Sequence, residues 1–283
     1  MFASLLRRIA FVGLALLLLS GDAFAGFQSR AREVAARWQG SALDRAWRTG
    51  FVSLEVLNPW GWDRAGRVPY WAARSAHNGA WELDAELPDE APAPVELSWP
   101  DGSTSRVPVV PAAAAFEKFR HGPDLNEDPC PKKCRPLVVT GVELGRVPLE
   151  TSRGVIQVPA WKFAVRDVDR PFVHVAVEPS AVTEKPRPAK GFHRHFWKAE
   201  PVAGRPAELR VRYGFGECDV VRGPFVHETD QVVVIGMETT LRPDAGACNE
   251  MLLTDTATVR LSRPLGDRIV LDLGTWLPVT DDH

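Results

Sequence analysis

The chain has 283 residues, of which 45% are hydrophobic, 25% charged and 9% aromatic. These proportions are ordinary for a globular protein and exclude a wholly disordered chain or a collagen-like fibre. The formal net charge of −2 argues against a nucleic-acid-binding protein, because such proteins neutralise phosphates with an excess of Lys and Arg. A chain of this length is expected to form one large domain or two modest ones.

Residues 1–25 have the features of a secretory signal peptide. Arg7 and Arg8 form a basic start, Ile9 to Leu19 is an apolar run, and Ala23-Phe24-Ala25 predicts cleavage after Ala25. The run is shorter than the ~20 residues that cross a bilayer. The alternative is an uncleaved signal anchor, and in both cases only this N-terminal segment would meet the membrane. We therefore expect a protein that is secreted or held at the extracellular face of the cell membrane.

Four cysteines follow, at Cys130, Cys134, Cys218 and Cys248. In an exported chain an even number of cysteines predicts a disulfide framework. Of the three possible pairings we favour Cys218–Cys248 with Cys130–Cys134, because each bond then closes a loop within one segment. A four-Cys zinc site is the alternative, but its usual paired Cys-x-x-Cys spacing is absent.

The part of the chain up to residue 122 predicts a helix followed by a small sheet. Residues 28–49 place Ala31, Val34, Ala35, Trp38, Ala42 and Ala46 three or four apart, which predicts an amphipathic helix. Its Arg-rich face could lie on anionic lipid. We favour a core-packing helix, because the apolar stripe is mostly Ala and Gly40 weakens the helix.

Alternating or turn-flanked segments predict the next elements. Strands are expected at 51–57 and 81–87, a hairpin with an Asp101-Gly102 turn at 95–110, and a short helix at 111–119. Residues 58–79 show no periodicity and predict a loop.

The second part predicts mainly β-structure. The expected strands lie at 137–142, 147–150, 155–165, 172–177, 208–215, 231–241, 257–261 and 269–273. Thr151 to Gly154 predicts the turn of a long hairpin, Pro159 a sheet edge or bulge, and 178–206 a surface loop. The Pro-rich segment 120–136 predicts a boundary between modules at 27–122 and 130–283. The fold class is therefore α+β and mostly antiparallel, with a disulfide-closed, β-sandwich-like second module.

Several short motifs together carry a resemblance to known proteins. They are Trp47-Arg48-Thr49-Gly50-Phe51, Asn78-Gly79-Ala80-Trp81, Trp99-Pro100-Asp101-Gly102, Thr151-Ser152-Arg153-Gly154, Val158-Pro159-Ala160-Trp161, the pair Cys218 and Cys248, and Pro264-Leu265-Gly266-Asp267-Arg268. On these the chain resembles a group of uncharacterised exported proteins of actinobacteria over most of its mature length. The resemblance implies export and a single architecture, and it implies no activity.

No common catalytic motif is complete. His227-Glu228 begins like a zinc-protease helix, but Gln231 stands where the second His ligand is required. Gly214-Phe215-Gly216 is an isolated pair of glycines, and neither a Gly-x-Ser-x-Gly elbow nor a phosphate-binding loop occurs. The sequence therefore predicts no catalytic residue and no cofactor. Arg268 is expected to form a structural ion pair with Asp267 or Glu228.

Two groups of side chains are candidates for binding. His193 and His195 would lie on one side of an extended segment, as two imidazole ligands of Zn²⁺ or Cu²⁺ would. The alternative is two loop histidines beside the cationic Arg194. Trp60, Trp62, Tyr70 and Trp71 cluster in one predicted loop. They could stack on a sugar ring or enter a partner surface, or they could fill a small core.

These observations favour an extracytoplasmic, non-catalytic protein of the cell envelope that binds an envelope protein or a cell-wall glycan, or that serves a structural role. A secreted hydrolase with an unrecognised carboxylate or His site is the first alternative. A metal-binding protein that uses His193 and His195 is the second. The sequence does not indicate the oligomeric state.

Overall fold

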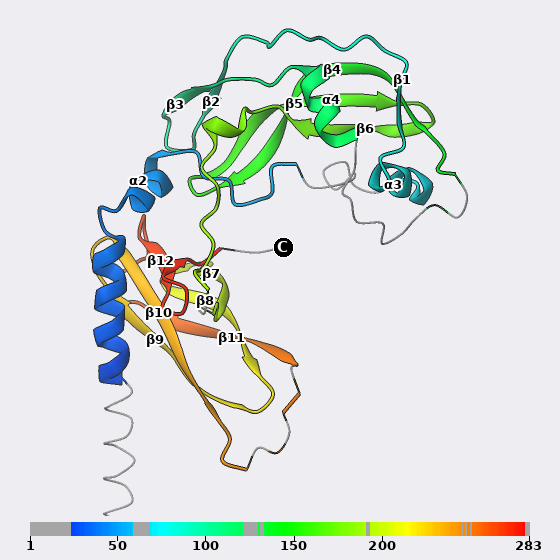
Figure 1. Ribbon diagram of the computed structural model, residues 1–283. Coiled ribbons are helices and arrows are strands. Elements are labelled where there is room, and N and C mark those ends of the chain that lie inside the picture. The colour runs from blue at the N-terminus through cyan, green and yellow to red at the C-terminus, as the bar shows by residue number, and fades with distance from the viewer. Residues whose placement is uncertain are drawn as a thin grey trace, which may run out of the picture. The chain divides into compact units, whose positions relative to one another are not determined.

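The computed structural model describes residues 24–58, 68–120, 130, 133–190, 193–244, 246, 248–249 and 251–280 (Figure 1). The protein belongs to the α+β class with mostly antiparallel sheets, as the sequence predicted. The chain forms two compact units. Unit 1 combines Met1–Asp44 with Pro186–His283, and unit 2 is Arg45–Lys185.

These units differ from the two modules expected at 27–122 and 130–283. The first cut falls inside the helix α2 (Ala42–Thr49), and the second falls within the predicted surface loop 178–206. The strand β1 (Trp81–Leu83) also pairs with β4 (Leu137–Thr151), across the expected boundary. Most of the Pro-rich segment lies outside the described residues, and pairing between distant strands determines which segments form a unit.

Unit 2 is built on a four-stranded sheet. Its order is β1-β4-β5-β6, with β5 at Gly154–Val165 and β6 at Val168–Val175. The β1–β4 pair is parallel, and the other two pairs are antiparallel. A separate hairpin joins β2 (Val95–Ser98) to β3 (Thr104–Val107). Its turn contains Gly102 at φ +84°, which is the conformation that the Asp-Gly signal predicted.

Two buried clusters fill unit 2. The first packs α3 (Tyr70–His77) and α4 (Ala112–Arg120) on the sheet through Ala72, Ala76, Phe116, Phe119 and Phe163. The second lies under the β2–β3 hairpin and contains Leu97, Trp99, Leu149 and Val158. A short 3-10 helix, η2 (Pro179–Ala181), follows β6.

Unit 1 contains two sheets that share one core. The first has the order β13-β12-β10-β9 and the second the order β11-β8-β7. The strands are β7 (Phe196–Val202), β8 (Arg205–Gly216), β9 (Asp219–Glu228), β10 (Val232–Leu241), β11 (Leu252–Arg260), β12 (Ile269–Asp272) and β13 (Leu277–Pro278). Buried side chains of both sheets, such as Val211 and Ile235, form one hydrophobic cluster, which gives the expected sandwich-like arrangement.

The N-terminal helix belongs to unit 1 and packs into its core. Residues 24–38 are helical and lie along β9 and β10 (Figure 1). The apolar stripe is buried at Phe27, Ala31, Val34, Ala35 and Trp38, while the Arg side chains face solvent. The core-packing interpretation is therefore confirmed. No helix in the described part of the chain is long and apolar enough to cross a membrane.

The predicted helix 28–49 is interrupted at Gly40, which has φ +70°. A second helix, α2, begins at Ala42, with the Ser41 hydroxyl accepting the Asp44 N–H at 3.0 Å. Since the break changes the phase of the 3.6-residue repeat, Ala42 of the predicted stripe is exposed.

Four other expectations were wrong. Tyr70–His77 is a helix although a loop was predicted, Phe196–Val202 is a strand within another predicted loop, and Asp219–Glu228 is a strand that was not predicted. Residues 51–57 form only two isolated bridges, Val52–Thr183 and Ser53–Thr151. The Ser53 hydroxyl donates to the Glu55 carbonyl at 2.7 Å, which turns the chain before a strand can extend.

Candidate functional site

Both favoured disulfides are present, one in each unit. Cys130 pairs with Cys134 in unit 2, and Cys218 pairs with Cys248 in unit 1. No free cysteine is found among the described residues. Paired cysteines are typical of proteins that fold in an oxidising compartment.

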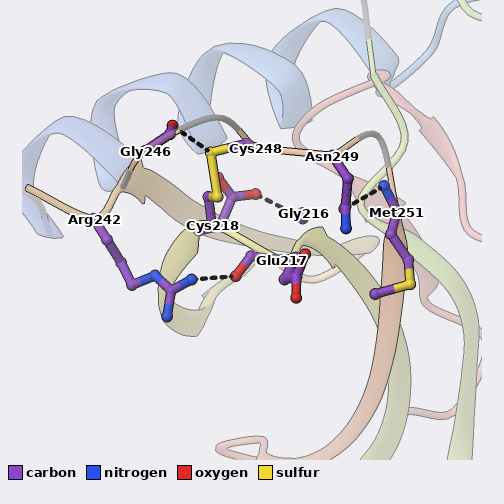
Figure 2. The surroundings of a disulfide bond; sticks show 9 residues. Gly216, Glu217, Cys218, Arg242, Gly246, Cys248, Asn249 and Met251 are labelled. Atoms are coloured by element: carbon purple, nitrogen blue, oxygen red, sulfur yellow. Dashed lines mark hydrogen bonds between the residues drawn. A yellow bond between two sulfur atoms is a disulfide. The ribbon is translucent and has the colours of Figure 1, made fainter. Parts of the chain in front are cut away.

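The Cys218–Cys248 bond joins the turn between β8 and β9 to the connection between β10 and β11 (Figure 2). The Arg242 guanidinium donates to the Glu217 carbonyl at 3.1 Å, and the Met251 N–H donates to the Asn249 side chain at 3.0 Å. Exposed apolar side chains surround this end of unit 1: Val220, Leu241, Met251 and Leu252.

Arg153 connects two turns of unit 2. Its guanidinium lies over the Trp99 indole at 4.1 Å from the ring centroid and donates to Asp101 Oδ2 and Ser103 Oγ, each at 2.6 Å. Bonds from Ser103 and then Arg153 lower the pKa of the Asp101 carboxyl below its usual range. Both turns were predicted from sequence, but the contact between them was not.

Arg268 forms an ion pair with Glu228, which is one of the two partners that the sequence proposed for it. Arg268 Nη1 lies 2.7 Å from Glu228 Oε2, and the guanidinium also donates to the carbonyls of Arg263, Pro264 and Leu265. Burial alone would raise the pKa of Glu228, but the bonds from Arg268 and Ser262 lower it below its ordinary value. The pair therefore fixes the loop after β11 to β9.

The two candidate metal ligands occupy different environments just before β7. His193 is exposed, whereas His195 is partly buried against the turn at Gly274. The Nδ1 atom of His195 is buried and has no hydrogen-bond partner among the described residues. Within the described ranges no group of three or more His, Cys, Asp or Glu side chains could hold a metal ion. The metal site thus stays a hypothesis that rests on two histidines.

Asp272 is a buried carboxylate beside His195 that sequence reasoning did not single out. Only 1% of Asp272 is exposed. It accepts the backbone N–H groups of His195 at 2.9 Å and Gly274 at 2.7 Å. Burial raises the pKa of the Asp272 carboxyl, although these bonds oppose the shift. Burial lowers the pKa of the Arg194 guanidinium, because the site disfavours its positive charge. The negative charge of Asp272 acts in the opposite direction and raises that pKa.

The aromatic candidates are only partly described, because Trp60 and Trp62 lie outside the described residues. Tyr70 starts α3 and is 70% exposed. Trp71 is half-buried against the first cluster of unit 2, and the Arg135 guanidinium lies 4.0 Å from its ring centroid. The Arg74 guanidinium lies 5.9 Å from the Tyr70 ring centroid. Of the described pair, Tyr70 is therefore the more exposed, whereas Trp71 contributes mainly to packing.

A scan of protein-family models and searches of curated proteins and of solved structures found no match to this chain.

Proposed function

We propose that the protein is an extracytoplasmic, non-catalytic component of the cell envelope that presents a surface to an envelope protein or a cell-wall glycan. The observation that carries the proposal is the distribution of the disulfides. Each compact unit has its own disulfide, so both units are suited to an oxidising compartment. The signal-like residues 1–25 and the resemblance to exported actinobacterial proteins support the same location.

The use of the buried charged groups supports a non-catalytic role. Arg268 and Glu228 hold a loop, and Asp272 accepts backbone N–H groups on both oxygens. Arg153 donates to a turn and to the Thr49 carbonyl. A catalytic acid or base needs access to a substrate proton, whereas these groups are occupied by structural hydrogen bonds.

Location is tested in the native host by fractionation combined with thiol labelling. We expect the protein outside the cytosol, with its cysteines unreactive to a maleimide until a reductant is added. Recovery of the native chain from the cytosol with four reactive thiols would contradict the proposal.

The binding role is tested by adding purified cell-wall glycans while tryptophan fluorescence is followed, and by affinity capture from the native envelope. A Tyr70→Ala variant serves as a probe of the described aromatic surface, because Tyr70 lies at the exposed start of α3. Saturable binding without turnover of the ligand supports the proposal. Release of products from any glycan or peptide would instead favour a secreted hydrolase.

A further inference from the structure

The sheet with the order β11-β8-β7 has one buried face and one exposed face. Val211 of β8 is buried in the core of unit 1, whereas Arg210 and Arg212 on either side of it are exposed. Thr256 and Thr258 of β11 pair with these two arginines and are exposed as well. Since cross-strand partners point to the same side of a sheet, these side chains form one outward face.

A β-bulge in β7 brings Trp197 to this outward face. The register between β7 and β8 shifts between Phe196 and Lys198, which leaves Trp197 as the extra residue. A Cβ atom at Gly214 would lie 2.0 Å from Cη2 and 2.2 Å from Cζ3 of the indole, so the ring takes the place of the missing side chain. Gly214 follows Arg212 by two residues and therefore faces outward. Bulges that redirect a side chain are frequent beside functional sites.

Next to the indole, two cations lie opposite each other. Lys198 and Arg212 are direct cross-strand partners, and like charges in this position destabilise a sheet. The adjacent pair has complementary charges, because Glu200 lies opposite Arg210. An anion held by both Lys198 and Arg212 would make their proximity favourable, since each would donate a charge-assisted hydrogen bond to it.

The carboxylates of this sheet do not neutralise its cations. Glu200 is shared by Lys198 and Arg210, at N–O distances of 3.3 and 3.9 Å. Glu208 is likewise shared by two arginines, and Arg212 adds a further positive charge. The side chains of Lys198 and Arg210 are 41% and 57% exposed, so their pairs with Glu200 are weak and a ligand anion can compete for them.

We infer that the outward face binds an acidic glycan, with a sugar ring against Trp197 and its carboxylate or phosphate group between Lys198 and Arg212. The inference rests on the proposed function and names the ligand class and its site. An indole offers an apolar surface to a sugar ring, and Arg and Lys recognise anionic oxygens. Alternate residues of a strand lie about 7 Å apart, so the indole over Gly214 and the Arg212 guanidinium can contact one sugar unit together.

Two threonines add hydroxyl groups to the same site. Thr254 and Thr256 are exposed on β11 in the two rows of the sheet that hold the indole and the like-charged pair. Their hydroxyls both donate and accept hydrogen bonds, as the hydroxyls of a sugar do. The intervening Asp255 lies on the core side, where the Tyr213 hydroxyl donates to its carboxylate at 3.4 Å. A simple inorganic anion would use only the cations, whereas a sugar acid uses all of these groups.

Isothermal titration of the purified protein with two matched pairs of oligosaccharides tests the ligand class. The first pair is oligogalacturonate and its neutral methyl ester, and the second is pentamannose phosphate and pentamannose. We expect an acidic member to bind with a dissociation constant of about 0.1 mM or tighter, and its neutral counterpart at least tenfold more weakly. The pair that responds shows whether the anionic group is a carboxylate or a phosphate.

Equal binding of acidic and neutral members, or no binding of either acidic member up to about 1 mM, would overturn the inference. The proposed function fails on a different result, which is recovery of the native chain from the cytosol. Saturable binding of a neutral cell-wall glycan would support the proposed function while removing the acidic ligand inferred for this face.

Single variants test the site itself. Arg212→Gln and Trp197→Ala should each weaken binding of the acidic oligosaccharide at least tenfold. Arg106→Gln is the matched control, since Arg106 is an exposed arginine of β3 in unit 2, and its affinity should equal that of the wild type. Arg212→Gln lies at an exposed position and decides the test if Trp197→Ala does not fold. Wild-type affinity in Arg212→Gln, or an equal loss in Arg106→Gln, would overturn the site.

Ionic strength separates the cationic and the aromatic contributions. Salt screens the attraction between exposed charges, so binding by the wild type should weaken as sodium chloride is added. Arg212→Gln should reduce this salt dependence, whereas Trp197→Ala should lower the affinity at every salt concentration and keep the dependence. The same salt dependence in Arg212→Gln and in the wild type would contradict an anionic group beside Arg212.

Discussion

The guanidinium carbon of Arg153 lies 4.1 Å from the centroid of the Trp99 indole, which joins the β4–β5 turn to the β2–β3 hairpin. The same guanidinium donates to Asp101 and Ser103 in the hairpin turn and to the Thr49 carbonyl. A planar guanidinium can stack on an indole and donate in its own plane at once, which a Lys ammonium cannot do. Two of the motifs behind the resemblance therefore form one structural contact.

Substitution of Arg153 by Lys should lower the free energy of unfolding of unit 2 by about 1–3 kcal/mol, since the stacking and the multiple hydrogen bonds are lost together. The side chain of Arg153 is only 10% exposed. Arg135→Lys is the matched control in the same unit. Arg135 also stacks on an indole, that of Trp71, but its side chain is 53% exposed, so a loss below ~0.5 kcal/mol is expected. Urea denaturation measures both, and equal losses would contradict the assignment.

Glu228 should make unit 1 less stable in acid. Its pKa in the folded protein is below the ordinary value of 4.5, so its stabilising effect is present above that value and is lost as the pH falls through the lowered pKa. Glu228→Gln should lower the free energy of unfolding of unit 1 by ~1–3 kcal/mol at neutral pH. The reason is that Arg268 is buried and loses a charged acceptor.

The pH dependence distinguishes this effect from a simple loss of packing. The difference in unfolding free energy between the wild type and Glu228→Gln should shrink as the pH falls below 4.5. A difference that stays constant from neutral pH to the acid range would show that the charge of Glu228 is not stabilising. Asp272 has a raised pKa, so its contribution to stability changes with pH in the opposite direction. Because both proteins contain Asp272, this contribution cancels in the difference between them.

The parts of the fold that were predicted from sequence depend on signals within a few residues. The Asp101-Gly102 turn, the Thr151 to Gly154 turn and the spacing of the cysteines all predicted structure that is present. The strand β9 was missed because Gly223 and Pro224 interrupt its alternation, and it is a strand only through its pairing with β10. The helix α3 was missed because it has only eight residues, too few for a clear periodicity.

The groups around the candidate site depend on contacts that no local pattern contains. Asp272 binds the N–H of His195, which is 77 residues away in the sequence. A single Asp at the end of an apolar strand does not indicate such a partner. The pairing of Arg268 with Glu228 also required the path of β9 beside the loop after β11. Residue types thus identified candidate groups, whereas tertiary pairing determined which groups meet.

The two disulfides should contribute unequally to stability. Replacement of Cys218 and Cys248 by Ala opens a loop with a sequence separation of 30, against a separation of 4 for Cys130 and Cys134. In the chain-entropy model the losses are ~3–4 kcal/mol and ~2 kcal/mol, respectively. Urea denaturation of the two double variants under non-reducing conditions measures both losses. A larger loss for the short loop would contradict the chain-entropy account.

Gly214 should tolerate no side chain while Trp197 is present. A Cβ atom at Gly214 would lie 2.0 Å from Cη2 of the Trp197 indole. Gly214→Ala should therefore destabilise unit 1 by about 1–3 kcal/mol. In the Trp197→Ala background the same change should cost much less, because the obstructing ring is gone. Gly141→Ala is the control, since a Cβ there meets nothing within 4 Å, and additive effects of the two substitutions would contradict the contact.

His193 and His195 should not form a specific zinc site. The two imidazoles find no third ligand among the described residues, the Nδ1 atom of His195 is buried, and the Arg194 cation lies between them in the sequence. Zinc and copper ions prefer several nitrogen, sulfur or carboxylate ligands together. Isothermal titration of the purified protein should therefore give a dissociation constant weaker than ~10 µM, with no change in a His193→Ala/His195→Ala variant. Tighter binding that disappears in that variant would establish a metal site and contradict this expectation.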